Sequence, residues 1–212
     1  MTSATNGAQA TGRTPRLPRS ARRKQLLAAA QAVFVAQGYH ATAMDDIAEC
    51  AGVSKPVLYQ HFPGKLDLYL ALLDTHCDAL VLKVQAAMGA TMVNSERISG
   101  AIRAYFEFVG HEGEAFRLVF ESDLRNEAAV RVRVERMEYE CIEAVTDTIM
   151  ADTGVSRESA ELLAAGLVGA ASASARFWLS GGRRVSKDLA ERLLSALAWR
   201  GIGAFPLHGE HE

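Results

Sequence analysis

Apolar residues recur at the spacing of an α-helix from about residue 20 onward. Leu26, Ala30 and Phe34 are each four residues apart, which places them on one face of a helix. Ser20 is a favoured residue for an N-terminal cap, and Gly38 is a favoured residue for a C-terminal stop. The pattern therefore predicts a first helix between these two positions.

Two short helices are predicted next, separated by a turn at Gly52. Thr42 precedes Asp45 by three residues, which is the spacing of a capping box, so we expect Thr42 to cap the second helix. Ser54 is expected to cap the third, with Pro56 in its first turn, where a missing N–H costs little. A helix, a turn and a second helix form a helix-turn-helix, in which the second helix enters the major groove of DNA.

Longer helices are predicted for the rest of the chain, and no run of residues indicates a strand. The predicted ranges are 65–90, 95–110, 113–122, 126–152, 157–180 and 186–203. The fold class is therefore all-α. We expect a flexible basic arm at 1–18, a helix-turn-helix domain at 19–64, an effector-binding and dimerisation bundle at 65–205, and a flexible tail at 206–212.

Charge is distributed unevenly along the chain. Residues 1–65 contain eight Lys or Arg and three Asp or Glu, whereas the remainder contains fifteen and twenty-two. The two parts therefore carry +5 and -7, although the whole chain carries only -2. Because phosphate contacts require cations gathered in one region, the N-terminal part is predicted to bind a polyanion.

Several classes of protein are excluded by what the sequence lacks. Cys50, Cys77 and Cys141 lie far apart, which indicates neither a zinc finger nor a disulfide framework and fits the cytoplasm. No continuous apolar run approaches the ~18 residues of a membrane span, so we expect no membrane association. No nucleophile elbow, phosphate loop or metal-binding helix motif is present, so we expect no enzyme activity, no metal and no cofactor.

The segment MDDIAECAGVSKPVLYQHFPGKLDLYLALL, residues 44–73, resembles the DNA-binding signature of TetR-family transcriptional regulators. The resemblance extends over residues 20 to about 75. It implies a homodimer with two helix-turn-helix heads, a palindromic double-stranded DNA operator, and a C-terminal bundle that binds a small-molecule effector.

DNA contacts are predicted from the residues and from this resemblance together. Lys55 can pair with guanine and Gln60 with adenine, each good pair contributing ~1–3 kcal/mol of discrimination. The resemblance implies that Thr42, Tyr59, His61 and Lys65 hold the DNA backbone. The full predicted set is Arg22, Thr42, Ser54, Lys55, Pro56, Val57, Tyr59, Gln60, His61 and Lys65.

Further segments, including RLPRSARRKQLL, FRLVFESDL and GLVGAASASARFWL, are similar to TetR-type regulators of fatty-acid synthase genes in actinobacteria. This similarity implies control, chiefly activation, of fatty-acid biosynthesis genes, with long-chain acyl-CoA as the effector that releases the protein from DNA. Two alternatives stay open. One is a TetR-type repressor of an efflux or catabolic operon that responds to another lipophilic molecule, and the other is an all-α lipid carrier that binds no DNA.

An acyl chain requires an apolar cavity, and helical bundles provide such cavities in their cores. Arg97, Arg103, Arg117 and Arg125 are available for coenzyme A phosphates, and the sequence does not choose among them. The predicted effector contacts are Tyr105, Phe106, Val109, Phe116, Val119, Phe120, Asp123, Arg125, Ile142, Val145 and Ile149.

Small residues repeat at three- and four-residue spacing in the helix predicted at 157–180. Such spacing lets a second helix approach closely. With an apolar stripe in the last helix, it predicts a four-helix dimer interface. The predicted interface residues are Gly166, Gly169, Ala173, Phe177, Leu193 and Leu197.

Overall fold

The computed structural model describes residues 17–110, 124 and 127–201, and all regular structure in these residues is α-helical. The helices are α1 (Arg19–Gln37), α2 (Met44–Cys50), α3 (Lys55–His61), α4 (Lys65–Gly89), α5 (Asn94–Gly110), α7 (Ala128–Thr153), α8 (Arg157–Ser180) and α9 (Lys187–Arg200). The all-α prediction is confirmed, and these helices begin and end within a few residues of the predicted positions. The helix predicted at 113–122 lies outside the described residues.

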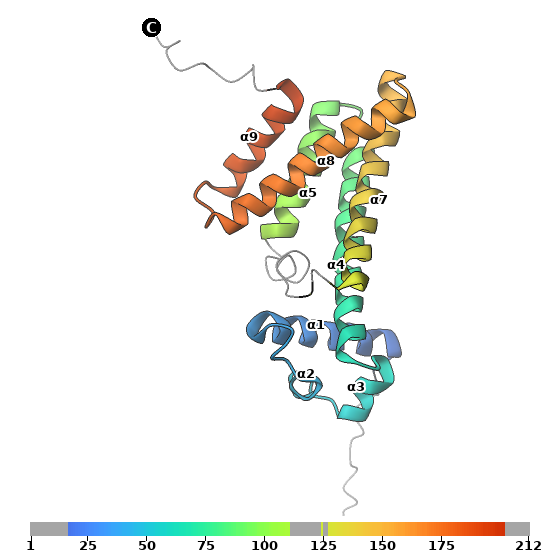
Figure 1. Cartoon of the computed structure of the whole chain (residues 1–212), viewed down its shortest axis with the longest axis vertical. Helices are drawn as coiled ribbons and strands as arrows, with labels where there is room; N and C mark the ends of the chain where they lie inside the picture. Colours follow the sequence, from blue (N-terminus) through green and yellow to red (C-terminus); the bar gives the residue numbers. More distant parts are fainter. Residues whose placement is uncertain (1–16, 111–123, 125–126, 202–212) are drawn as a thin grey trace, which may run out of the picture.

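Two parts of the chain are joined by one long helix (Figure 1). The short helices α1, α2 and α3 form a head at one end of the molecule, while α5, α7, α8 and α9 form a bundle at the other. Helix α4 begins in the head and runs alongside α7 into the bundle. At 1.5 Å per residue, its 25 residues span about 37 Å.

The head has a small core that its apolar periodicity predicts. Leu26 and Phe34 of α1, Ile47 of α2 and Leu58 of α3 are each at most 2% exposed. Tyr69, on the second turn of α4, is buried against the Phe34 ring at a centroid distance of 5.5 Å. The start of α4 is therefore part of the head core.

The predicted N-terminal caps of α1 and α2 are each wrong by one or two positions. Helix α1 begins at Arg19, after Pro18 rather than at Ser20. Helix α2 is preceded by Ala43, whose backbone N–H donates to the Asp46 carboxylate at 2.9 Å. The Thr42 hydroxyl instead donates to the Gly38 carbonyl at 2.7 Å, so it fastens the loop before α2.

The turn between α2 and α3 requires glycine. Gly52 has a φ of +63°, in the left-handed region that residues with a side chain adopt at a cost. The following residue, Val53, donates its N–H back to the Ala48 carbonyl at 3.0 Å, which closes the turn. The Gln25 amide donates to the Ala51 carbonyl at 2.7 Å and ties this turn to α1.

Helix α8 is long and apolar enough to cross a membrane by length and composition, with a mean hydropathy of 1.4 in its most apolar window. No membrane span is predicted from the sequence because Ser and Gly residues interrupt the apolar run of this helix. A core or interface helix meets the same two criteria, and one third of that window is buried inside the chain. The finding therefore does not by itself indicate a membrane.

Candidate nucleic-acid interface and effector cavity

The outward face of α3 presents the side chains that the sequence predicts. Tyr59 is 48% exposed, and Lys55, Pro56 and Gln60 are also exposed. Leu58 is fully buried beneath them and fixes the orientation of the helix. A helix with this division of faces can offer its polar side to a DNA groove.

Two further predicted residues lie near the start of α3. Ser54 is exposed at the N-cap position, and its side chain makes no capping hydrogen bond there. Its hydroxyl therefore remains available to a phosphate. Val57 is half-buried, in keeping with its expected position beside the groove-facing residues.

Lys55 is already paired within the head. Its ammonium lies 2.5 Å from the Asp45 carboxylate, and both side chains are more than half exposed. The hydrogen bond that Lys55 donates to Asp45 is the main cause that raises the pKa of Lys55. The sequence did not indicate this pairing of Lys55 with Asp45.

Lys65, a predicted phosphate contact, makes several hydrogen bonds within the head. Its ammonium donates to the carbonyls of Tyr39 and Thr42, each at 2.8 Å, and to the carbonyl of His40 at 3.3 Å. An ammonium has three N–H donors, so these bonds occupy all of them. Lys65 therefore holds the loop between α1 and α2 against the start of α4.

Thr42, another predicted phosphate contact, also has its side chain engaged inside the head. Thr42 is 2% exposed, and its hydroxyl is engaged with the Gly38 carbonyl. Buried hydroxyls require a hydrogen-bond partner, and this one finds it inside the head. The side chain of Thr42 shapes the loop and does not reach its surface.

Cations from α1 gather beside the end of α3. Desolvation lowers the pKa of His61, and the charges of Arg19, Arg23 and Arg22 lower it further. Arg23 lies 4.4 Å from the centroid of the Phe62 ring, which connects the same two helices. The predicted residue Arg22 donates to the Gln25 side chain at 2.7 Å. The geometry therefore joins α1 and α3 into one basic surface.

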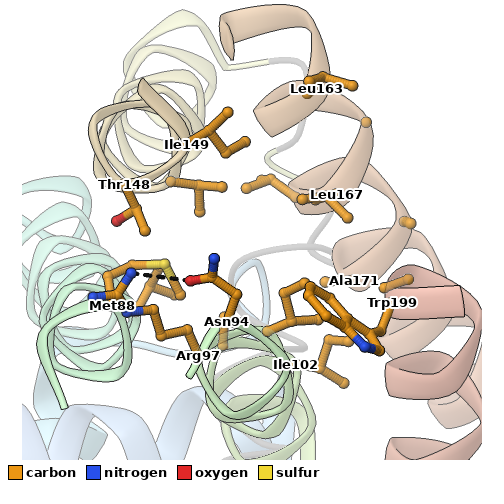
Figure 2. A pocket seen from close by; sticks show the side chains of 18 of the residues that line it. Met88, Asn94, Arg97, Ile102, Thr148, Ile149, Leu163, Leu167, Ala171 and Trp199 are labelled. Atoms are coloured by element: carbon orange, nitrogen blue, oxygen red, sulfur yellow. Dashed lines mark hydrogen bonds between the residues drawn. The ribbon is translucent and has the colours of Figure 1, made fainter. Parts of the chain in front are cut away.

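A cavity of about 540 Å³ lies in the bundle between α4, α5, α7, α8 and α9. Figure 2 shows side chains from these helices converging on it, among them Met88, Ile102, Ile149, Leu167 and Trp199. Most of the lining is apolar, and the volume lies within the range of small-molecule sites. The arrangement suits a ligand with a hydrocarbon body.

Three of the predicted effector residues line this cavity: Tyr105, Val145 and Ile149. Phe106 does not, because it lies one residue further around α5 and packs on Trp178 at a ring-centroid distance of 5.6 Å. Val109 is buried and Ile142 is half-buried, and neither borders the cavity. The remaining predicted residues, Phe116, Val119, Phe120, Asp123 and Arg125, lie outside the described residues.

The sequence did not predict the cluster of polar side chains at one end of the cavity. Arg97 is only 8% exposed, and its Nη1 donates to Asp152 at 2.6 Å and to Asn94 at 3.0 Å. A signal existed, because Arg97 stands four and eight residues before the lining residues Ala101 and Tyr105. The distant partner Asp152 could not be paired with it from the sequence.

A second hollow, of about 830 Å³, follows the outer faces of α8 and α9. The predicted interface residues Ala173, Phe177, Leu193 and Leu197 line it. Phe177 is 79% exposed, an unusual position for a large aromatic ring. Gly169 is exposed on α8, whereas Gly166 borders the effector cavity.

Comparison with known proteins identifies the family. The profile described as "Bacterial regulatory proteins, tetR family" matches residues 26–72, from α1 into α4. The HTH-type transcriptional activator FasR of Mycolicibacterium smegmatis is 46% identical over 192 residues, which cover 91% of this chain and 88% of that protein. The chain belongs to the TetR family. As a TetR-family protein it is a DNA-binding transcriptional regulator, and its head is the DNA-reading part.

Solved structures of TetR-like proteins share the whole fold. A TetR-like regulator from Rhodococcus sp. RHA1 is 31% identical and has a TM-score of 0.68, covering 90% of this chain and all of that one. The regulator FadR from Bacillus subtilis, solved in complex with stearoyl-CoA, has a TM-score of 0.70 over 84% of this chain and 98% of its own. Its identity is 18%, so that similarity concerns the fold alone.

Proposed function

We propose that this TetR-family protein controls fatty-acid biosynthesis genes, chiefly as an activator, and that long-chain acyl-CoA binds the bundle cavity and releases the protein from DNA. The 46% identity to an activator named FasR and the fold shared with a regulator bound to stearoyl-CoA support this proposal. The protein acts by binding alone, in the cytoplasm and without a cofactor or metal.

One observation carries the proposal: α4 belongs to both sites. Leu68 and Tyr69, near its start, are buried in the head, while Val84 and Met88, near its end, line the cavity. A ligand that displaces the far end of α4 therefore moves the head as well. Since ligand and DNA favour different positions of one helix, each weakens the binding of the other by the same factor.

The proposal includes a homodimer that meets a palindromic operator. Phe177, Leu193 and Leu197 form an apolar surface on α8 and α9 that a second copy would cover. A two-fold dimer presents its two α3 helices to successive major grooves about 34–36 Å apart. We expect Phe177→Glu to give monomers in analytical ultracentrifugation, while Leu82→Glu, an exposed position on α4, leaves the dimer intact.

The test is DNA binding to the promoter of the fatty-acid synthase genes of the source organism, at fixed salt, during titration with acyl-CoAs of increasing length. Long chains should release the DNA and short chains should not, since each additional buried methylene contributes about 0.8 kcal/mol. DNA binding that no acyl-CoA changes would reject the proposed effector. The absence of specific DNA binding would reject the regulator itself.

A pair of matched variants separates regulator from lipid carrier. Tyr59→Ala on the exposed face of α3 should weaken DNA binding strongly and leave acyl-CoA binding unchanged. Tyr139→Ala, on the exposed face of α7, is the control and should change neither. The reciprocal measurement is acyl-CoA affinity with and without operator, and equal affinities would contradict the coupling through α4.

A further inference from the structure

The polar end of the effector cavity holds a partly buried ion pair. Arg97 and Asp152 both line the cavity, and their closest nitrogen and oxygen atoms are 2.6 Å apart. Their side chains are 9% and 22% exposed. The charge of Arg97 is therefore neutralised by the protein itself before a ligand enters.

These two groups set the net charge of the cavity. Among the described residues that line it, Arg97 is the one basic side chain and Asp152 the one acidic side chain. The lining of the described cavity is therefore neutral overall. A charged ligand group that enters it finds no unpaired opposite charge.

Hydrogen-bond donors nevertheless remain at this end. Nε of Arg97 donates to the Thr91 carbonyl at 2.5 Å, and Nη2 donates to the Met92 sulfur at 3.2 Å. With the two bonds from Nη1 to Asp152 and Asn94, four of the five guanidinium donors have partners in the described part of the chain. The second Nη2 proton has no acceptor among the described residues.

The Asn94 amide adds a second donor group. Figure 2 shows Asn94 reaching from α5 toward the middle of the cavity, with its oxygen bonded to Arg97 and its nitrogen turned toward Thr148 and Leu167. The amide nitrogen carries two N–H groups and no charge. The end of the cavity therefore combines uncharged donors with a paired charge.

We propose that the Arg97–Asp152 pair makes the cavity selective for lipids with an uncharged oxygen group, such as the carbonyl of an ester or thioester, over free fatty acids. An ester carbonyl accepts a hydrogen bond from Arg97 or Asn94 and leaves the ion pair intact. A carboxylate meets the like charge of Asp152, or must displace Asp152 from Arg97. This inference rests on the proposed function and assigns the ligand chemistry of that same cavity.

The first test uses the unaltered protein without DNA. Calorimetric titrations compare octanoic to palmitic acids with their methyl esters at neutral pH, where the acids are ionised. The ester should bind at least about tenfold more tightly than the acid of equal chain length, a difference of about 1.4 kcal/mol. Equal binding, tighter binding of the acid, or no binding of any ester would overturn the inference.

The second test changes the charge of the pair. In Asp152→Asn the guanidinium loses its counter-charge, so affinity for the free acid should rise at least about tenfold while that for the ester changes less than about threefold. The matched control is Asp147→Asn, the same substitution at a position of α7 that is 70% exposed, which should change neither affinity. A folded Asp152→Asn protein with unchanged selectivity would contradict the role of the pair.

A third variant keeps the inference testable if Asp152→Asn does not fold. Arg97→Gln combined with Asp152→Asn removes both charges and leaves no buried ion unpaired. The gain in acid binding expected for Asp152→Asn should disappear, since it depends on the unpaired guanidinium. The preference for the ester, which depends on the charge of Asp152, should disappear as well. Retention of the original selectivity in this double variant would overturn the inference even if Asp152→Asn does not fold.

These measurements are independent of the proposed regulation. Selective ester binding without any effect on DNA would support the ion-pair selectivity and reject the proposed function. Release of DNA by acyl-CoA together with equal binding of acid and ester would support the proposed function and reject the ion-pair selectivity. The two proposals can therefore fail separately.

Discussion

The head and the bundle differ in how their interiors are filled. In the head, Lys65 binds three carbonyls, Thr42 binds a fourth, and the rings of Phe34, Tyr39 and Tyr69 pack at centroid distances of 5.2–5.7 Å. In the bundle, the helices border a cavity of about 540 Å³ with a partly buried ion pair at one end. A DNA reader requires fixed geometry, whereas an effector site requires space, and the two regions meet these needs with the same kind of helix.

Breaking the Arg97–Asp152 ion pair should lower the stability of the bundle. Arg97→Leu leaves the partly exposed Asp152 without its partner, which should cost about 1–3 kcal/mol, less than the loss of a fully buried pair. We expect a marked fall in the thermal unfolding temperature measured by circular dichroism. The control is Arg97→Leu with Asp152→Leu, which should recover most of the loss because no charge is left unpaired. Equal destabilisation by the single and the double variant would show that packing, and not charge, is responsible.

Lys65→Met should loosen the head without touching the cavity. Hydrogen bonds to charged groups contribute about 1.5–3 kcal/mol, and this substitution removes three from one loop. The unfolding temperature and DNA affinity should both fall, while ester binding stays constant. Lys83→Met, which removes a more exposed amine from α4, is the matched control.

The result also decides between two roles of this lysine. If Lys65→Met weakens DNA binding and leaves the unfolding temperature unchanged, then Lys65 contacts phosphate directly. In that case the bonds seen in the head do not describe its role on DNA. A parallel fall of stability and DNA affinity supports the fastening role.

The same substitution should have opposite outcomes in the two regions. Ala30 of α1 is fully buried in the packed head, so Ala30→Leu should overpack it and cost about 1–3 kcal/mol. Ala171 of α8 is also buried, but it borders the cavity, so Ala171→Leu can extend into free space. Thermal unfolding should show a loss for the first variant and almost none for the second.

Ala171→Leu should also change the response of the protein to its effector. Ala171→Leu should weaken acyl-CoA binding and leave operator binding intact, giving a regulator that long chains no longer release. A large loss of stability in Ala171→Leu would mean that the cavity cannot accept even a leucine side chain. It would also argue against an acyl ligand at that position.

The fold could be predicted from the sequence because helical periodicity and glycine stops are local signals. The head chemistry was only partly predictable. Exposed positions such as Tyr59 and Gln60 follow from spacing on one short helix, but the bonds from Lys65 to residues 39–42 depend on chain folding over more than twenty positions. The cavity was the least predictable part, since neighbours such as Tyr105 and Phe106 differ only in the direction of one helical step.

The smallest expected effect concerns His61 and pH. Desolvation and the charges of Arg19, Arg23 and Arg22 lower its pKa, so the folded head holds fewer protons at this site than the unfolded chain does. Stability from this group should therefore be full above its unfolded pKa, near 6.5, and fall as pH decreases through the range below it. DNA phosphates stabilise the protonated form, so operator binding should take up a proton and strengthen slightly as pH falls from about 7.5 to about 6.

His61→Gln isolates this contribution, because glutamine keeps a hydrogen-bonding side chain that does not titrate in this range. Its operator affinity should depend less on pH than that of the unaltered protein, measured at constant salt. His40→Gln, a substitution in the loop before α2, is the matched control and should keep the original dependence. If both variants behave like the unaltered protein, the proton is taken up elsewhere and the basic surface of α1 and α3 does not include His61 on DNA.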